Sequence, residues 1–88
     1  PDIERFPCLQ IAADAFNAGG SACAVMNAAN EIAVEGFLNG NLRFTEIPSL
    51  IRRVLEGADI RELHTIDDVF DADAQGRQLA QSMLSTFG

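Results

Sequence analysis

The stretch that decides the fold is ACAVMNAANEIAVEGFL, residues 22–38. Alanine, leucine, methionine and glutamate make up most of it, and these residue types favour a helix. Ser21 precedes the stretch and is a residue type that caps helices by accepting a backbone amide. Asn39-Gly40-Asn41 follows it and is suited to end a helix. The sequence therefore predicts a helix over residues 22–39.

This helix would carry small and apolar residues on one broad face: Val25, Ala29, Ile32, Ala33, Gly36 and Phe37. Val34 and Leu38 would fall on the other side, among Asn27, Glu31 and Glu35. Apolar residues on both sides predict a helix that is buried on more than one side. We therefore expect it to be the central member of a bundle.

The segment before it predicts a helix over residues 7–18. Its apolar residues recur at the spacing of one helix face: Leu9, Ala12, Ala13 and Phe16. Pro7 suits a first helical turn, and Gly19-Gly20 suits a helix end because glycine readily adopts the left-handed conformation found there.

The segment after it predicts a third helix, over residues 46–56, with Thr45 as its cap. The apolar stripe of this helix would be Ile47, Leu50, Ile51, Val54 and Leu55. Arg52, Arg53 and Glu56 would face water, and Gly57 would end the helix.

Near the end of the chain, Thr65 and Asp68 have the spacing of a capping box, which predicts a short helical turn near residues 66–70. A fourth helix is predicted over residues 71–87, with Asp71 as a second cap. Its inner stripe would be Ala72, Gly76, Leu79, Ala80, Met83 and Phe87. Gly76 indicates a close helix crossing. No pair of β-rich runs flanks a hairpin turn, so the sequence predicts an all-α fold, a small four-helix bundle.

Composition limits the classes of function. A chain of 88 residues is expected to form one domain, residues 1–88. The formal net charge is -7 and the six basic residues form no stripe, which argues against nucleic acid or an anionic membrane as a partner. The apolar runs are far shorter than the roughly 20 residues of a membrane helix. The lack of an initiator Met and of a signal peptide indicates an excised fragment of a soluble protein.

The two cysteines, Cys8 and Cys23, lie in apolar, helix-favouring surroundings. Two cysteines cannot form a dense disulfide framework, and without paired histidines they do not form a zinc site. We expect both to be buried free thiols in a reducing compartment, which predicts a cytoplasmic protein.

Asn27, Asn30 and Glu31 form the most promising chemical cluster, because residues three and four apart share a helix face. Two amides and a carboxylate in a mostly buried helix would serve either a ligand or metal site, or a structural hydrogen-bond network. One carboxylate is few for a hard cation, which favours the structural interpretation. Unsatisfied buried polar groups cost on the order of 1 to 3 kcal/mol, so we expect these side chains to bond neighbouring backbone.

The remaining candidates are weaker. Gly19-Gly20-Ser21 precedes a helix and would suit an anion, but no strand precedes it and no lysine follows it. A helix end followed by a cap explains the same residues. His64 is the only histidine and lies in an expected exposed connector. The acidic run consists of Asp67, Asp68, Asp71 and Asp73. It would either attract a cation loosely or stabilise the N-terminus of a helix through the helix dipole. We therefore predict no catalytic, cofactor-binding or metal-binding residue.

Four segments together resemble the C-terminal domain of the 1-deoxy-D-xylulose 5-phosphate reductoisomerase family. They are RFPCL at residues 5–9, MNAANEIAV at 26–34 with FL at 37–38, RFTEI at 43–47 and TIDDV at 65–69. The resemblance spans nearly the whole chain, and the pairing of the first two segments at this separation is its most specific part. The family's domain is a helical bundle, in agreement with the periodicity.

The resemblance implies a parent oxidoreductase of isoprenoid biosynthesis by the methylerythritol phosphate pathway. Such an enzyme converts 1-deoxy-D-xylulose 5-phosphate to 2-C-methyl-D-erythritol 4-phosphate with NADPH and a divalent cation, Mg or Mn. It also implies a bacterial, cytoplasmic homodimer. The residues that bind NADPH, metal and substrate lie in domains that this chain does not contain, so the resemblance implies a supporting domain, inactive alone, whose partner is the catalytic domain.

The resemblance carries over Asn27, Asn30 and Glu31 as a motif of architectural value, together with Phe6 to Leu9 as the entry of the first helix, and no catalytic residue. An independent helical module that binds another protein through an apolar groove is the alternative function.

Overall fold

The computed structural model describes residues 7–87, and the side chains from Ile11 onward except that of Ala12. Its elements are α1 (Pro7–Ala18), α2 (Ala22–Leu38), the short 3-10 helix η1 (Phe44–Glu46), α3 (Ile47–Gly57) and α4 (Ile66–Leu84). These residues include no strand, which confirms the predicted all-α class with four helices. Expectations for Arg5 and Phe6, and for the side chains of Cys8 and Leu9, lie outside the described part.

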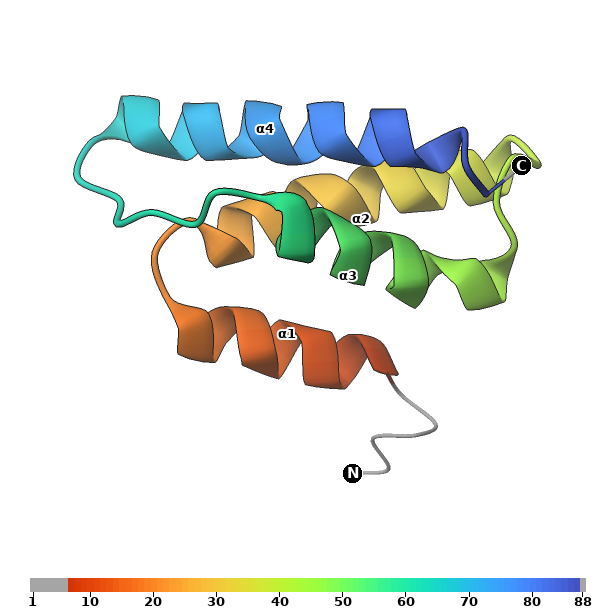
Figure 1. Cartoon of the computed structure of the whole chain (residues 1–88), viewed down its shortest axis with the longest axis horizontal. Helices are drawn as coiled ribbons and strands as arrows, with labels where there is room; N and C mark the ends of the chain where they lie inside the picture. Colours follow the sequence, from red (N-terminus) through yellow and green to blue (C-terminus); the bar gives the residue numbers. More distant parts are fainter. Residues whose placement is uncertain (1–6, 88) are drawn as a thin grey trace.

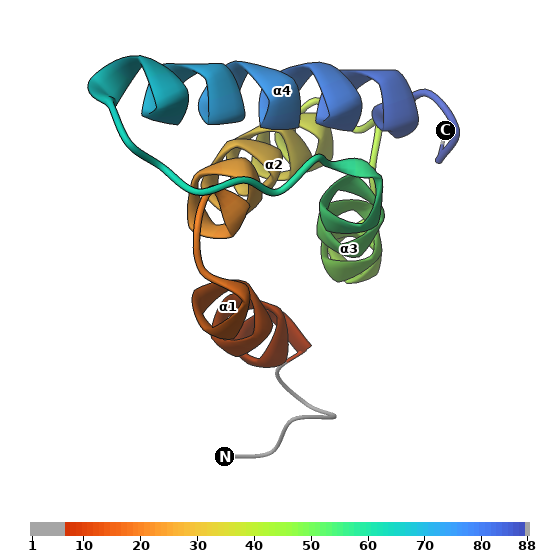
Figure 2. The same cartoon turned by 60° about the vertical axis from the view of Figure 1, so that its left-hand side comes forward.

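The helices are stacked around α2 and α3. In Figures 1 and 2, α4 runs along one side of this pair and α1 lies on the opposite side. Helix α2 contacts α1, α3 and α4, so its predicted central position is confirmed. No helix among the described residues is both long enough and apolar enough to cross a membrane.

The core lies where α2, α3 and α4 meet. Its largest fully buried side chains are Leu50, Val25 and Val54. The predicted stripe of α3 is confirmed, since Ile47, Leu50, Ile51 and Val54 are buried and Leu55 is half-buried. The charged residues on the other side of α3 are exposed, as the pattern predicts.

Helices α2 and α4 pack closely because small residues line their contact. A Cβ atom on Gly76 would lie 2.8 Å from the carbonyl oxygen of Val25 and 3.0 Å from the Cβ of Ala28. Real Cβ atoms do not approach a backbone oxygen so closely, so only glycine fits without a shift. The predicted close crossing at Gly76 is therefore confirmed.

The end of the chain differs from the prediction in three respects. The expected short turn at 66–70 and the expected helix at 71–87 are one continuous helix, Ile66–Leu84. The capping box of Thr65 and Asp68 starts this helix, and no proline interrupts it. Asp71 therefore lies inside α4 and caps nothing. Residues 85–87 form turns rather than the last helical turn.

Two predicted caps are also wrong. Ser21 precedes α2 without capping it, because its hydroxyl accepts the backbone amide of Arg61 instead. Thr45 lies within η1, and the backbone amide of Arg43 donates to the carboxylate of Glu46 at 2.9 Å. The Ser21 contact is distant in the chain and no local pattern contains it, whereas the bond between Arg43 and Glu46 spans three residues and is a local signal that the Thr45 assignment overlooked.

The predicted inner face of α1 is wrong as well. Ile11 and Ala15 are buried, whereas Ala13 and Phe16 face water. Two overlapping apolar sets run along this helix, and the period alone does not choose between them.

Three apolar residues of α2 are more exposed than expected. Phe37 was assigned to the buried face but is 40% exposed, because it lies at the rim of that face beside Phe44. Val34 and Leu38 lie on the opposite side, as predicted, but that side is exposed rather than buried. Helix α2 is therefore central, but buried along one broad face only.

Candidate functional site

The Asn27, Asn30 and Glu31 motif lies on the solvent side of α2. All three residues are exposed, so the expected polar network in a buried helix is wrong. Helical spacing does place them on one side, but that side is opposite the face that α2 buries through Val25 and Ala29. Asn27 and Asn30 are therefore available to a partner outside the bundle, whereas Glu31 bonds Arg77 of α4.

Glu31 meets Arg77 and Asp73 of α4 in an ion-pair cluster. The Arg77 guanidinium donates to the Asp73 carboxylate at 2.8 Å from Nε and 3.3 Å from Nη2, and Nη2 also donates to Glu31. These hydrogen bonds, first from Asp73 and then from Glu31, raise the pKa of Arg77. Both carboxylates thus face a permanent cation, an arrangement that ties α2 to α4 and repels a metal ion.

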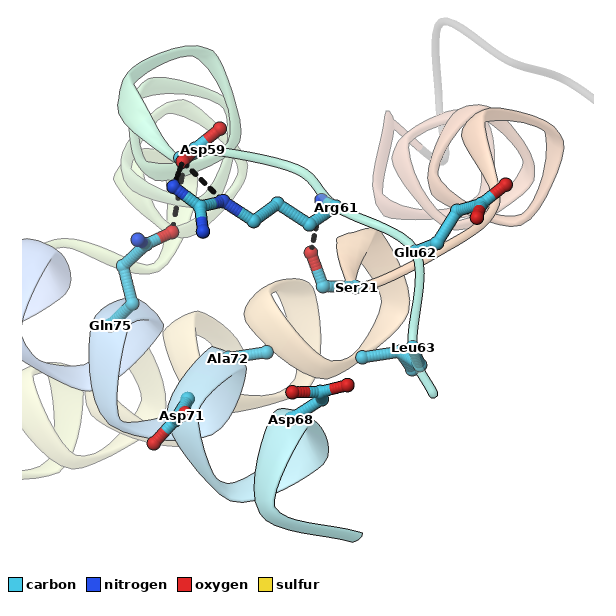
Figure 3. Close-up of a pocket in the computed structure, with 9 residues that line it drawn as sticks. All are labelled: Ser21, Asp59, Arg61, Glu62, Leu63, Asp68, Asp71, Ala72 and Gln75. Carbon is cyan, nitrogen blue, oxygen red and sulfur yellow. Dashed lines mark hydrogen bonds and ion pairs between the residues drawn. The ribbon is translucent and has the colours of Figure 1, made fainter. Parts of the chain in front are cut away.

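A cavity of about 270 Å³ opens between the connector after α3 and the first turns of α4. Figure 3 shows its lining: Ser21, Asp59, Arg61, Glu62, Leu63, Asp68, Asp71, Ala72 and Gln75. Several of these polar groups are already paired. The Arg61 Nε donates to Asp59 at 2.6 Å, and the Asp59 amide donates to the Gln75 side chain at 3.0 Å.

The Gly19-Gly20-Ser21 turn is occupied by the protein itself. The Ser21 amide donates to the Arg61 carbonyl at 2.8 Å, and the Ser21 hydroxyl accepts the Arg61 amide at 2.9 Å. Gly20 has φ +56°, and a Cβ there would lie 2.3 Å from the same carbonyl oxygen. The turn therefore receives the connector. The predicted helix end at Gly19-Gly20 is confirmed, and the Ser21 amide is bonded within the protein.

Asp68 shows why the acidic run belongs to the start of α4. Its carboxylate accepts the backbone amides of His64 at 2.9 Å and Thr65 at 3.1 Å, while its own amide donates to the Thr65 hydroxyl at 3.1 Å. The two accepted bonds, first that from His64, lower the pKa of Asp68. Within residues 7–87, no three His, Cys, Asp or Glu side chains are grouped to hold a metal ion.

The other candidates for chemistry are isolated at the surface. The His64 Nε2 lies 3.5 Å from a Glu62 carboxylate oxygen, and both side chains are exposed. Cys23 is a free thiol as predicted, but it is exposed rather than buried. It starts the solvent side of α2, opposite Ala22 and Val25.

Sequence reasoning missed the two clusters around Arg61 and Arg77. Asp73 and Arg77 lie four residues apart, and this spacing was a local signal for one ion pair of the Arg77 cluster. The partners Glu31 and Ser21 lie 46 and 40 residues away in the chain, and no local pattern connects them.

Comparison with known proteins gives one consistent result. The family described as the DXP reductoisomerase C-terminal domain matches residues 1–79. The 1-deoxy-D-xylulose 5-phosphate reductoisomerase of Nitrosomonas eutropha is 49% identical over 86 residues, which cover 98% of this chain and 21% of that protein. Its namesake from Pseudomonas fluorescens is 51% identical over 88 residues, which cover 100% of this chain and 22% of that protein.

A solved structure agrees in fold. It is the 1-deoxy-D-xylulose 5-phosphate reductoisomerase of Zymomonas mobilis in complex with NADPH, with a TM-score of 0.93 and 37% identity. The match covers 98% of this chain and 23% of that one. The chain thus spans about a fifth of the length of its curated relatives. On both sequence and fold, it belongs to the DXP reductoisomerase C-terminal domain family.

Proposed function

We propose that residues 1–88 form the C-terminal helical domain of a 1-deoxy-D-xylulose 5-phosphate reductoisomerase. The whole enzyme is then an NADPH-dependent oxidoreductase that converts 1-deoxy-D-xylulose 5-phosphate to 2-C-methyl-D-erythritol 4-phosphate in isoprenoid biosynthesis. One observation carries the proposal: relatives of that name align with 98% to 100% of this chain at about half identity.

In this proposal the rest of the enzyme binds NADPH and the divalent cation, Mg or Mn. The described residues do not fit either group. No set of three ligands converges within residues 7–87, and the one glycine-rich turn is filled by the Arg61 carbonyl. In the whole enzyme the cofactor would supply a hydride and the cation a Lewis acid, and both chemistries would lie outside this domain.

The domain's own role is to support the catalytic domain, which is its proposed partner. Positioning groups must be held closely, since a misplacement of about 1 Å can cost on the order of 100-fold in rate. We propose that the enzyme is a homodimer of the bacterial cytoplasm that binds neither nucleic acid nor membrane. Bacterial relatives support a bacterial enzyme, and the net charge of -7 argues against nucleic acid and anionic membrane as partners. The homodimer is what the resemblance to the family implies.

The test uses the full-length protein that contains this sequence. We expect it to oxidise NADPH only when 1-deoxy-D-xylulose 5-phosphate and a divalent cation are present. A version truncated before residue 1 should lose folding or most of its activity. Absence of turnover by the intact, folded protein would contradict the proposed activity, and full turnover by the truncated one would contradict the supporting role.

A further inference from the structure

The side of α2 that faces away from the bundle combines polar and apolar residues in one continuous surface. We define this outer α2 face by residues Asn27, Asn30, Val34, Phe37 and Leu38 of α2 together with Phe44 of η1. Residues 27, 30, 34 and 38 follow one another at three or four positions, so they lie along one side of the helix. Leu38 is 74% exposed and Phe44 is 70% exposed.

A ring contact joins the two elements of this face. The centroids of Phe37 and Phe44 lie 5.6 Å apart at 64°, an edge-on arrangement that aromatic rings prefer. Next to them, Val34 and Leu38 line a shallow hollow with Asn30, Glu31 and Glu35. The apolar half of the outer α2 face is thus preorganised before any partner arrives.

The composition of this face is unfavourable for a surface that only meets water. Contiguous apolar patches on a protein surface are usually interaction sites. Asparagine is also a weaker helix former than alanine, because its side chain competes for backbone hydrogen bonds. Asn27 and Asn30 both lie inside α2, exposed, and neither is at a cap.

The other exposed apolar groups of the described chain are simpler. Phe16 stands on α1, Leu63 lies in the connector before α4, and Ile66, Val69 and Phe70 form one side of the first turns of α4. None of these groups combines two elements, a ring contact and amide side chains. Interface cores are typically enriched in aromatic residues and bordered by polar groups, and the outer α2 face has this composition.

We propose that the outer α2 face docks against the remainder of the same reductoisomerase polypeptide, an inference that rests on the proposed function. The apolar half would bury Leu38 and Phe44, and the amides of Asn27 and Asn30 would bond polar groups of the partner. About four fifths of each curated relative lies outside this domain, which supplies an occupant of sufficient size.

Charge argues against a second copy of the chain as the occupant. Glu35 borders the hollow beside Val34 and Leu38, and Arg77 is already bonded to Glu31 and Asp73. A two-fold contact through this face would bring the Glu35 side chains of the two copies toward each other. Like charges across an interface oppose association, whereas a different surface with arginine or lysine opposite Glu35 would be complementary.

Thiol labelling of the native full-length protein tests the proposal. Leu38→Cys and Phe44→Cys are single changes at exposed positions outside the core, so the domain should still fold. Labelling is read by peptide mass spectrometry, which separates the new thiols from Cys8 and Cys23. Each rate is compared with that of the same variant unfolded in urea.

We expect labelling at both positions to be slowed by about tenfold or more in the native protein, because a docked side chain reacts only when the interface opens. The protection should persist when the protein is diluted until its subunits separate. Labelling within about threefold of the unfolded rate at either position overturns the proposal. Protection that disappears as the subunits separate also overturns it, since the occupant is then a second copy.

The two proposals fail separately. Turnover of 1-deoxy-D-xylulose 5-phosphate tests the activity and does not require the outer α2 face to be covered. Protection of Leu38 and Phe44 tests the docking surface and is read without substrate.

Discussion

Helices α3 and α1 carry the same spacing of apolar residues, yet they meet the rest of the molecule differently. Helix α3 buries its predicted stripe, including Leu50 at 0% exposure, against α2 and α4. Helix α1 lies at the edge of the bundle, buries Ile11 and Ala15, and leaves Phe16 77% exposed.

The difference teaches that periodicity identifies a helix more reliably than it identifies the buried side. In α3, Arg52, Arg53 and Glu56 occupy the side opposite the stripe, so only one orientation avoids burying charge. In α1 the apolar residues extend around much of the helix, and either of two faces would satisfy the pattern.

The sharpest test substitutes one large residue from each helix in the 88-residue chain. Leu50→Ala should lower the free energy of unfolding by about 2 to 5 kcal/mol, because it leaves a cavity in the core. Phe16→Ala should change it by less than about 0.5 kcal/mol, because an exposed ring loses few contacts. Urea unfolding measures both. A loss at Phe16 as large as that at Leu50 would break the comparison.

The contrast between buried and exposed positions extends to the smallest side chains. Gly76→Val should destabilise the chain by about 1 to 3 kcal/mol, since the new atoms meet the backbone of Val25. Ala74→Val on the exposed side of the same helix is the matched control, with an expected loss of less than about 1 kcal/mol from helix propensity. Thermal unfolding compares the two. Equal losses would mean that α2 and α4 can separate at little cost.

Helix starts offer a smaller version of the same test. Thr65→Ala should cost about 1 kcal/mol, because the Thr65 hydroxyl accepts the Asp68 amide at the start of α4. Thr45→Ala should cost less than about 0.5 kcal/mol, because Thr45 is exposed and caps nothing. Chemical unfolding of the two variants measures the difference. A larger loss of stability for Thr45→Ala than for Thr65→Ala would indicate that Thr45 is a helix cap after all.

The smallest expected effect concerns pH. The folded pKa of Asp68 lies below 3.8, so folding favours its charged form. This contribution to stability is complete above the unfolded pKa and is lost as the pH falls through the folded one. Carbon-13 NMR titration of Asp68 should give a midpoint below 3.8. Asp68→Asn should remove this part of the pH dependence of stability. A midpoint above 3.8 would mean that folding favours the protonated form of Asp68 instead.

Much of the fold followed from local signals. Apolar spacing gave α1, α2 and α3 within one residue of their observed bounds, and the Thr65 and Asp68 spacing gave the start of α4. Two of the errors share a physical cause, a contact between residues far apart in the chain. The Ser21 hydroxyl bonds a residue 40 positions away, and the side chosen by α1 depends on helices that lie later in the chain.

The motif on α2 was predictable in a more limited sense. Spacing placed Asn27, Asn30 and Glu31 on one side, but that side was also expected to be buried because Val34 and Leu38 lie there. Apolar residues on an outward face are ambiguous in a sequence, since a core and a docking surface use the same residue types. The assignment of that face to a partner is therefore a proposal from the structure.

The paired hydrogen bonds between Ser21 and Arg61 also bear on the order of folding. They close a loop of 40 residues, whereas the Thr65 and Asp68 bonds close a loop of three. A long loop loses more chain entropy on closure, so the short contact forms first and the long one follows once α2 and α3 have packed. We therefore expect the start of α4 to form locally and the connector to fix its direction late in folding. Hydrogen exchange at the Arg61 amide accordingly reports on the assembled bundle, although the Arg61 side chain is exposed.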